Sequence, residues 1–268
     1  DRRGHPELAE RLEACYVERS GDRELPELSA FYRGYRALVR AKVAALGAGD
    51  AERRGELLDD AREHVHLALG YALPSALVLV GGLPGTGKSF LAPHVARALR
   101  ARTHRSDVVR KQLAGLEPGE RAGADYGEGL YTPEARAETY AALRTAAERD
   151  LAAGRSVVVD ASFTRRAQRA PFVELATGLG VACLVLEVTA PLEVVRERLE
   201  ARARRGTDAS DADLAVHLRA RESHEPPEPV EGAVVARIDS SSGSSATHTA
   251  RAFERLLASA GNLGGDGC

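Results

Sequence analysis

The amino-acid sequence predicts an α/β fold of three layers, with a five-stranded parallel sheet and a segment of helices in front of it. After Pro74, short β-branched and aliphatic runs alternate with stretches of helical periodicity, which is typical of a parallel sheet covered on both faces. Before Pro74, apolar residues recur every three or four positions, which indicates helices alone. We therefore expect a helical segment over residues 1–72, an α/β domain over 73–260 and a flexible tail over 261–268.

Three helices are expected in the first segment. Gly21 and the glycines at 47 and 49 interrupt the apolar periodicity, and the third helix ends before Pro74 because the residue before a proline disfavours the helical conformation. Aromatic residues at helical spacing usually pack in a core, and we predict that role for those of this segment. They are Tyr16, Phe31, Tyr32, Tyr35 and Tyr71.

The strands of the α/β domain are predicted from short apolar runs that end at polar or glycine residues. The run at 76–80 stops at Gly81 and Gly82, and the run at 156–160 stops at Asp160. The others are predicted at 103–106, where the pattern is weak, at 181–188 and at 233–238.

Helices fill the gaps between these strands. They are predicted at 88–102, 107–113, 133–153, between the third and fourth strands, at 192–205, up to residue 221, and at 247–260. Pro133 and Pro191 suit the starts of two of them, since a proline in the first turn loses no helical hydrogen bond.

The composition is that of an ordinary globular chain. Of 268 residues, 44% are hydrophobic, and 37 Lys and Arg oppose 39 Asp and Glu, for a net charge of -2. This balance argues against extended nucleic acid as a partner, because such binding needs a basic surface. The apolar runs fall far short of the roughly 20 residues of a membrane helix, so no membrane partner is expected. Three scattered cysteines favour a reduced, cytoplasmic protein.

Residues 82–89 read Gly-Leu-Pro-Gly-Thr-Gly-Lys-Ser and match the motif G-x-x-x-x-G-K-S/T between a predicted strand and a predicted helix. Glycines let backbone N–H groups converge on phosphate oxygens, and the helix N-terminus adds partial positive charge. The sequence therefore predicts a P-loop NTPase fold that binds ATP. The predicted ATP-binding residues are Gly82, Leu83, Pro84, Gly85, Thr86, Gly87, Lys88, Ser89 and Phe90.

Three polar side chains have predicted roles in this site. Lys88 can reach the β- and γ-phosphates as a flexible point charge. Ser89 offers a hydroxyl to Mg²⁺. Asp160 ends a strand at the carboxyl edge of the sheet, where it can hold Mg²⁺ through water or orient the acceptor. The alternative for Asp160 is a cap on the turn at 161–162.

Four segments of the chain together resemble the AAA-type kinases related to phage polynucleotide 5'-kinase, zeta toxin and chloramphenicol phosphotransferase. They are residues 82–89, Arg-Ser-Asp-Val-Val-Arg at 105–110, Val-Asp-Ala-Ser-Phe at 159–163 and Arg-Arg-Gly-Thr-Asp at 204–208. The resemblance covers residues 76–240.

The resemblance implies catalytic roles for three residues besides Lys88. Asp107 is the general base that accepts the proton of the acceptor hydroxyl, and Arg110 binds the acceptor or its phosphate. Arg205 is the lid arginine that contacts the transferring phosphoryl group, with Arg202 and Arg204 as alternatives. For Asp107, a helix N-cap is a second hypothesis. Most arginines of the predicted helix at 192–205 are expected on a solvated face.

Residues 1–9 and 31–43 resemble the end of an aminoglycoside-phosphotransferase-like domain, which in bacterial bifunctional proteins precedes a P-loop kinase of this type. The chain starts at Asp1 and contains no methionine, so we expect it to be a piece of a longer protein fused to such a domain. The His-Gly-Asp type loop that such a domain needs for catalysis is missing from 1–72, so these helices are expected to pack on the kinase or to link to it.

The expected activity is ATP- and Mg²⁺-dependent transfer of a γ-phosphoryl group to a hydroxyl acceptor, either a small molecule or a polynucleotide 5' end. The loop at 115–132 is expected to select the acceptor. The alternative is a nucleotide-gated regulatory ATPase module that has no small-molecule acceptor. The histidines are not predicted to form a metal site.

Overall fold

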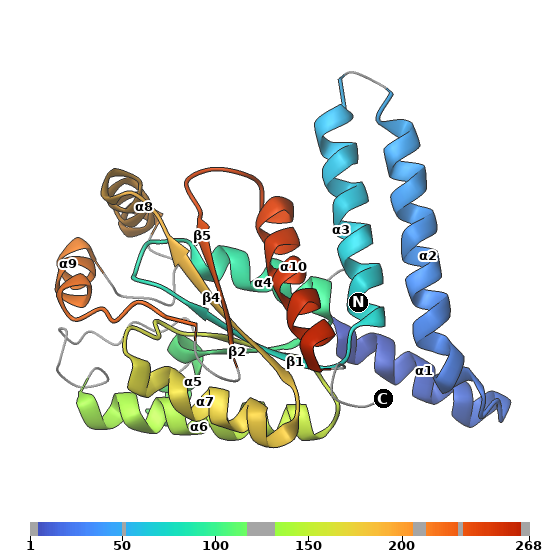
Figure 1. The fold of residues 1–268 in the computed structure, drawn as a ribbon, viewed down its shortest axis with the longest axis horizontal. Helices are drawn as coiled ribbons and strands as arrows, with labels where there is room; N and C mark the ends of the chain where they lie inside the picture. The colour runs from blue at the N-terminus through green and yellow to red at the C-terminus, as the bar shows by residue number, and fades with distance from the viewer. Residues whose placement is uncertain (1–4, 50–51, 117–131, 206–212, 230–232, 264–268) are drawn as a thin grey trace.

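The protein, a computed structural model, is described over residues 5–49, 52–116, 132–205, 213–229 and 233–263. Its described part contains one sheet of five parallel strands, as the sequence predicted, and the strand order is β2-β3-β1-β4-β5. The strands are β1 Ala76–Gly81, β2 Arg102–Arg105, β3 Val157–Asp160, β4 Ala182–Thr189 and β5 Val234–Asp239. Strand β1 lies at the centre, so the loop that follows it lies at the middle of the carboxyl edge (Figure 1).

The helices lie close to their predicted positions. They are α1 Pro6–Ser20, α2 Leu25–Gly47, α3 Arg54–Ala72, α4 Lys88–Leu99, α5 Ser106–Leu113, α6 Pro133–Ala152, α7 Arg166–Leu179, α8 Leu192–Arg205, α9 Leu214–Glu222 and α10 Ser245–Leu263. Helix α4 ends earlier than predicted because Arg100 takes a left-handed conformation with φ of 54°. Helix α10 continues to Leu263, so the prediction that a flexible tail begins at residue 261 was wrong. Residues 264–268 of the predicted tail lie outside the described part.

Two apolar layers sandwich the sheet, because successive side chains of a strand point to opposite faces. From β1, Val78 and Val80 pack toward α4 and α10, whereas Leu77 and Leu79 pack toward α6 and α7 (Figure 1). All four side chains have no exposed surface. This double burial explains why the strand reads as an unbroken apolar run.

The helical segment stands beside the α/β domain as an antiparallel hairpin of α2 and α3, with α1 lying across its foot (Figure 1). Helix α3 approaches α4 so closely at Gly70 that a Cβ there would lie 2.0 Å from the Ala98 carbonyl oxygen. The Arg100 guanidinium stacks over the Tyr71 ring at 4.3 Å. These contacts attach the hairpin to the helix that begins at the P-loop.

The aromatic residues of α1 and α2 do not pack as predicted. Tyr16 is 54%, Phe31 68% and Tyr35 58% exposed, and Tyr32 is exposed as well, whereas Tyr71 is partly buried against α2. The reason is that α2 turns its small residues toward α3, including Ala37, which lets the two helices lie close together. The large side chains therefore face away from the hairpin.

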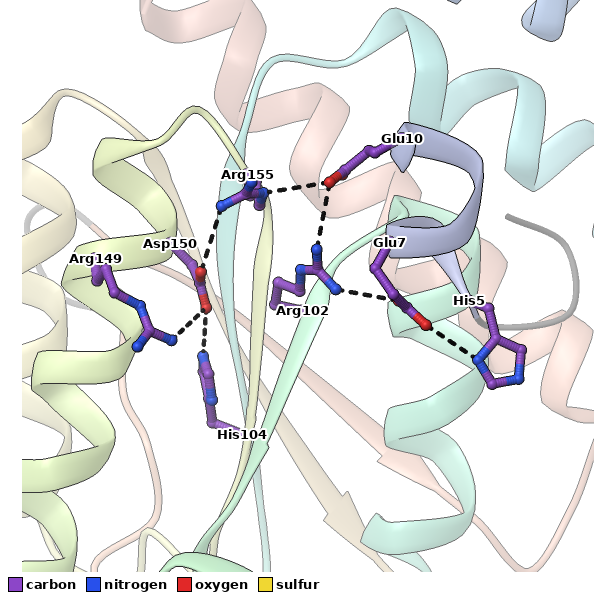
Figure 2. Close-up of polar contacts among 8 residues, drawn as sticks. All are labelled: His5, Glu7, Glu10, Arg102, His104, Arg149, Asp150 and Arg155. Carbon is purple, nitrogen blue, oxygen red and sulfur yellow. Dashed lines mark hydrogen bonds and ion pairs between the residues drawn. The ribbon is translucent and has the colours of Figure 1, made fainter. Parts of the chain in front are cut away.

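An ionic network attaches α1 to the edge of the sheet, as Figure 2 shows. Arg102, the first residue of β2, donates to Glu7 at 3.1 Å and to Glu10 at 3.3 Å. The Arg155 Nε lies 3.7 Å from Oε2 of Glu10, and its Nη1 lies 3.7 Å from Oδ1 of the buried Asp150. Single surface ion pairs contribute little, but this network is built around a buried charge. No helix among the described residues is long and apolar enough to cross a bilayer.

Candidate active site

The loop between β1 and α4 has the backbone that its glycines predict. Gly82 has φ of 137° and Gly87 has φ of 94°, in the region that side-chain-bearing residues rarely adopt. A Cβ on Gly82 would also lie 2.2 Å from the Val188 carbonyl oxygen. Both glycines are therefore required by shape, and the loop wraps around a point at the N-terminus of α4.

The ammonium of Lys88 folds back into this loop. Its Nζ donates to the Leu83 carbonyl at 2.9 Å, and the Thr86 hydroxyl donates to the same oxygen at 2.8 Å. Burial lowers the pKa of Lys88 to about 8, and the charge of Arg202 lowers it too, whereas Asp160 and Asp107 act in the opposite direction. The side chain is therefore a desolvated cation close to two carboxylates.

Asp160 lies at the end of β3 and is 5% exposed. Burial raises the pKa of its carboxyl, and Lys88 and a hydrogen bond with the Ser89 side chain oppose this effect. The Phe163 amide, three residues on, is one that a cap at Asp160 would bind, and it donates instead to the Tyr140 hydroxyl at 3.0 Å. A hydroxyl beside a buried carboxylate is a set of hard oxygen donors, which fits Mg²⁺.

Asp107 lies in the first turn of α5 but not at its N-cap, where Arg105 stands, so the N-cap hypothesis was wrong. One carboxylate oxygen of Asp107 accepts from the Val108 amide at 2.9 Å, and the other accepts from Arg105 at 2.6 Å. The Arg105 Nε also lies 3.9 Å from Asp160. Arg105, to which the sequence analysis gave no role, thus joins the two carboxylates.

The structure describes the side chains of three of the four other predicted arginines. Arg110 follows Asp107 by one turn of α5, and its charge acts on the phenol of Tyr140, whose pKa is raised chiefly by burial. Arg202 is near enough to act on Lys88, whereas Arg204 is exposed. The side chain of Arg205 lies outside the described residues, as do residues 117–131 of the predicted acceptor loop.

Arg198 contacts the P-loop, although the sequence analysis gave this arginine no role of its own. Its guanidinium donates to the Ser240 hydroxyl and to the Ser240 carbonyl, both at 2.8 Å, and lies 3.4 Å from the Thr86 carbonyl. The Ser240 hydroxyl donates to the Thr86 carbonyl at 2.6 Å. The spacing of Arg198 and Arg202 by one helical turn was the signal in the sequence, since such residues share a face.

His217 is a second residue that the sequence analysis did not single out. It is buried on α9, and its Nδ1 lies 2.7 Å from the Pro84 carbonyl oxygen, to which a ring N–H can donate. A lone histidine in a polar stretch carries no signal for such a contact, which depends on how α9 packs on the loop.

The chain is similar in sequence to known proteins. Uncharacterized proteins of Mycobacterium tuberculosis (strain H37Rv) and Mycobacterium bovis are 34% identical to this chain over 224 residues. The alignment covers 82% of this chain and 44% of each relative, so the chain spans less than half of the curated relatives it matches.

Among solved structures, Kti12 of Chaetomium thermophilum in complex with ADP-AlF3 has a TM-score of 0.51 at 19% identity, over 68% of this chain and 97% of that one. The likeness is one of fold, that of a P-loop NTPase. Residues 77–227, more than half of the chain, match the family model of the AAA domain. With a P-loop between β1 and α4 and Asp160 at the tip of the neighbouring strand, the chain belongs to the AAA domain family.

Proposed function

We propose that this chain is a kinase that transfers the γ-phosphoryl group of ATP to a hydroxyl acceptor. The observation that carries the proposal is the convergence of Lys88, the Ser89–Asp160 pair and Asp107 at one point of the sheet edge. A cation, a pair of hard oxygen donors and a separate carboxylate are what phosphoryl transfer from ATP requires. A module that binds a nucleotide without turning it over has no use for the separate carboxylate.

The P-loop amides and Lys88 bind the β- and γ-phosphates and hold the γ-phosphorus in line with the acceptor. Ser89 and Asp160 would hold Mg²⁺, which when bound neutralises charge on the phosphate oxygens. The ADP of the Kti12 complex is a nucleotide that the same fold binds. Arg202, on the helix after β4, is the best placed lid arginine in the described part of the chain.

Asp107 positions the acceptor and takes its proton. The acceptor oxygen forms a bond to the γ-phosphorus, the bond from that phosphorus to the β–γ bridging oxygen breaks, and ADP leaves. The proton of the hydroxyl passes to an oxygen of Asp107, for which the Arg105 contact at 2.6 Å has to loosen. Arg110 would bind the acceptor from the next turn of the helix.

The acceptor is a small molecule or the 5' end of a polynucleotide. The net charge of -2 provides no broad basic surface for a longer nucleic acid. We place the protein in the cytoplasm, and we propose that the polypeptide that carries this chain also carries a phosphotransferase-like domain.

The test is a screen of hydroxyl compounds and 5'-hydroxyl oligonucleotides with γ-labelled ATP, followed by Asp107→Asn on whichever acceptor is labelled. Loss of the general base is expected to lower kcat by about 10² to 10⁴ while ATP binding is unchanged. The control is Glu193→Gln, which also replaces a carboxylate with an amide, but at an exposed residue of α8. It is expected to leave kcat unchanged. If no acceptor is labelled and ATP turnover is the same with Asp107→Asn, the protein is the regulatory ATPase module instead.

A further inference from the structure

Helices α1 and α2 both expose large apolar side chains, and we call the two sets together the α1–α2 face. Three large apolar side chains of α1 and seven of α2 are 48% to 73% exposed. They include Leu12, Tyr16, Phe31, Tyr35, Leu38 and Leu46. No other group of exposed apolar side chains in the described residues is comparable.

The periodicity of α2 shows that this face is patterned. Phe31, Tyr35 and Leu38 follow one another by four and three positions, so they form a stripe along the helix. The opposite side of α2 is apolar too, because Ala37 and Ala41 are buried on it. A helix that is apolar on both sides is typical of a protein interior.

The face is larger than a monomer usually leaves in water. An aromatic side chain buries about 150–250 Å², so Phe31, Tyr32 and Tyr35, at 68%, 55% and 58% exposure, alone expose on the order of 300–450 Å². The exposed leucine and valine side chains of α2 add to this area, so that helix alone reaches the upper end of the roughly 300–600 Å² of the largest patch on a typical monomer. The total approaches the roughly 800 Å² that each partner contributes to a stable protein interface.

The charges beside the stripe distinguish between occupants. Arg36, Arg40 and Lys42 are exposed on α2, and Glu27 is the only carboxylate of that helix. If two copies of the chain packed α2 on α2, these cations would lie near the same cations of the other copy, which is unfavourable at an interface. A partner with an apolar centre and carboxylates at its rim complements the α2 part of the face.

We propose that the α1–α2 face is the docking surface of a second folded domain in the same polypeptide, one that meets it with apolar side chains ringed by Asp and Glu. The chain matches 44% of the length of its curated relatives, so those proteins contain enough additional residues for such a domain. Because α3 packs on α4 at Gly70, the docked domain is held in a fixed position relative to the P-loop helix.

Hydroxyl-radical footprinting tests this by comparing the 268-residue chain with the polypeptide of its complete reading frame. The oxidation rates of Phe31 and Tyr35 are expected to fall by about fivefold or more in the longer protein, as for side chains moved into an interface core. Phe90 is the matched control, since it is also 68% exposed but lies on α4, and its rate is expected to stay the same. The readout needs no ATP, so it is independent of whether the chain is a kinase.

Three results of this comparison overturn the proposal. The first is equal oxidation of Phe31 and Tyr35 in both proteins, and the second is a reading frame that adds no further domain. The third is slow oxidation of Phe31 and Tyr35 in the 268-residue chain itself that becomes fast when the protein is diluted. That result identifies a second copy of the chain as the occupant. A second measurement uses the double variant Phe31→Ser, Tyr35→Ser of the isolated chain. Its binding of a dye for exposed apolar surface is expected to fall severalfold, and its Tm is expected not to fall. A lowered Tm means that the two rings are packed within this chain, and it contradicts the proposal.

Discussion

Replacing Lys88 with methionine is expected to stabilise the protein without nucleotide, although the same change removes the proposed ligand of the phosphates. In the folded state the pKa of Lys88 falls from 10.5 to about 8, chiefly because the ammonium is desolvated. This shift corresponds to about 3 kcal/mol against the charged form. Methionine has a similar length and no charge to desolvate.

Part of this gain is lost again with the contacts of the ammonium. Lys88→Met leaves the Leu83 carbonyl with one donor fewer, which costs about 1 kcal/mol. It also removes the cation that favours the ionised form of Asp160. We therefore expect the free energy of unfolding to rise by about 1–2 kcal/mol at neutral pH.

The pH dependence identifies the cause. Between pH values of about 8 and 10.5 the unfolded chain holds a proton on Lys88 that the folded chain has released, so the wild-type protein gains stability as the pH rises through that window. Lys88→Met lacks this gain, and its advantage is expected to shrink toward alkaline pH. Urea unfolding at several pH values measures both proteins.

The matched control is Lys42→Met, because Lys42 is exposed on α2. This variant is expected to keep the pH profile of the wild type. The reasoning is refuted if Lys88→Met is less stable than the wild type at neutral pH, or if the difference between the two is the same across the whole window.

Three further changes test the contacts around the P-loop. Arg198→Ala is expected to weaken ATP binding by up to about tenfold, since it removes hydrogen bonds to Ser240. Titration calorimetry measures the affinity, and Arg196→Ala, at an exposed position of the same helix, is expected to leave it unchanged. His217→Phe strips the Pro84 carbonyl of its donor and is expected to lower the free energy of unfolding by about 1–3 kcal/mol in urea; an unchanged midpoint contradicts the contact. Gly70→Ala forces α3 away from α4 and is expected to cost about 1–3 kcal/mol. Gly55→Ala in the same helix meets no atom and is expected to stabilise the protein by up to about 1 kcal/mol.

The sheet and the P-loop were predictable because their signals are local. The strand at 76–81 is apolar on both faces, and the motif after it needs glycines whose backbone the structure confirms. Helix ends were less predictable: Arg100 is not a residue type that announces a left-handed conformation.

The residues that the sequence analysis missed depend on contacts between distant segments. Arg198 meets Ser240, and His217 meets Pro84, only after α8 and α9 have packed on the loop. The aromatic stripe of α2 was misinterpreted for a related reason. Periodicity identifies an apolar face, but it does not say whether the surface that covers that face belongs to the same hairpin.

The position of β1 in the middle of the sheet affects the order of events during synthesis. Strand β1 is made first of the five strands, yet both strands that flank it, β3 and β4, are made much later. The Val188 backbone that presses on Gly82 belongs to the last of these. A nascent chain that has not yet released β4 from the ribosome therefore has the P-loop sequence without its shape, and nucleotide cannot assist its early folding.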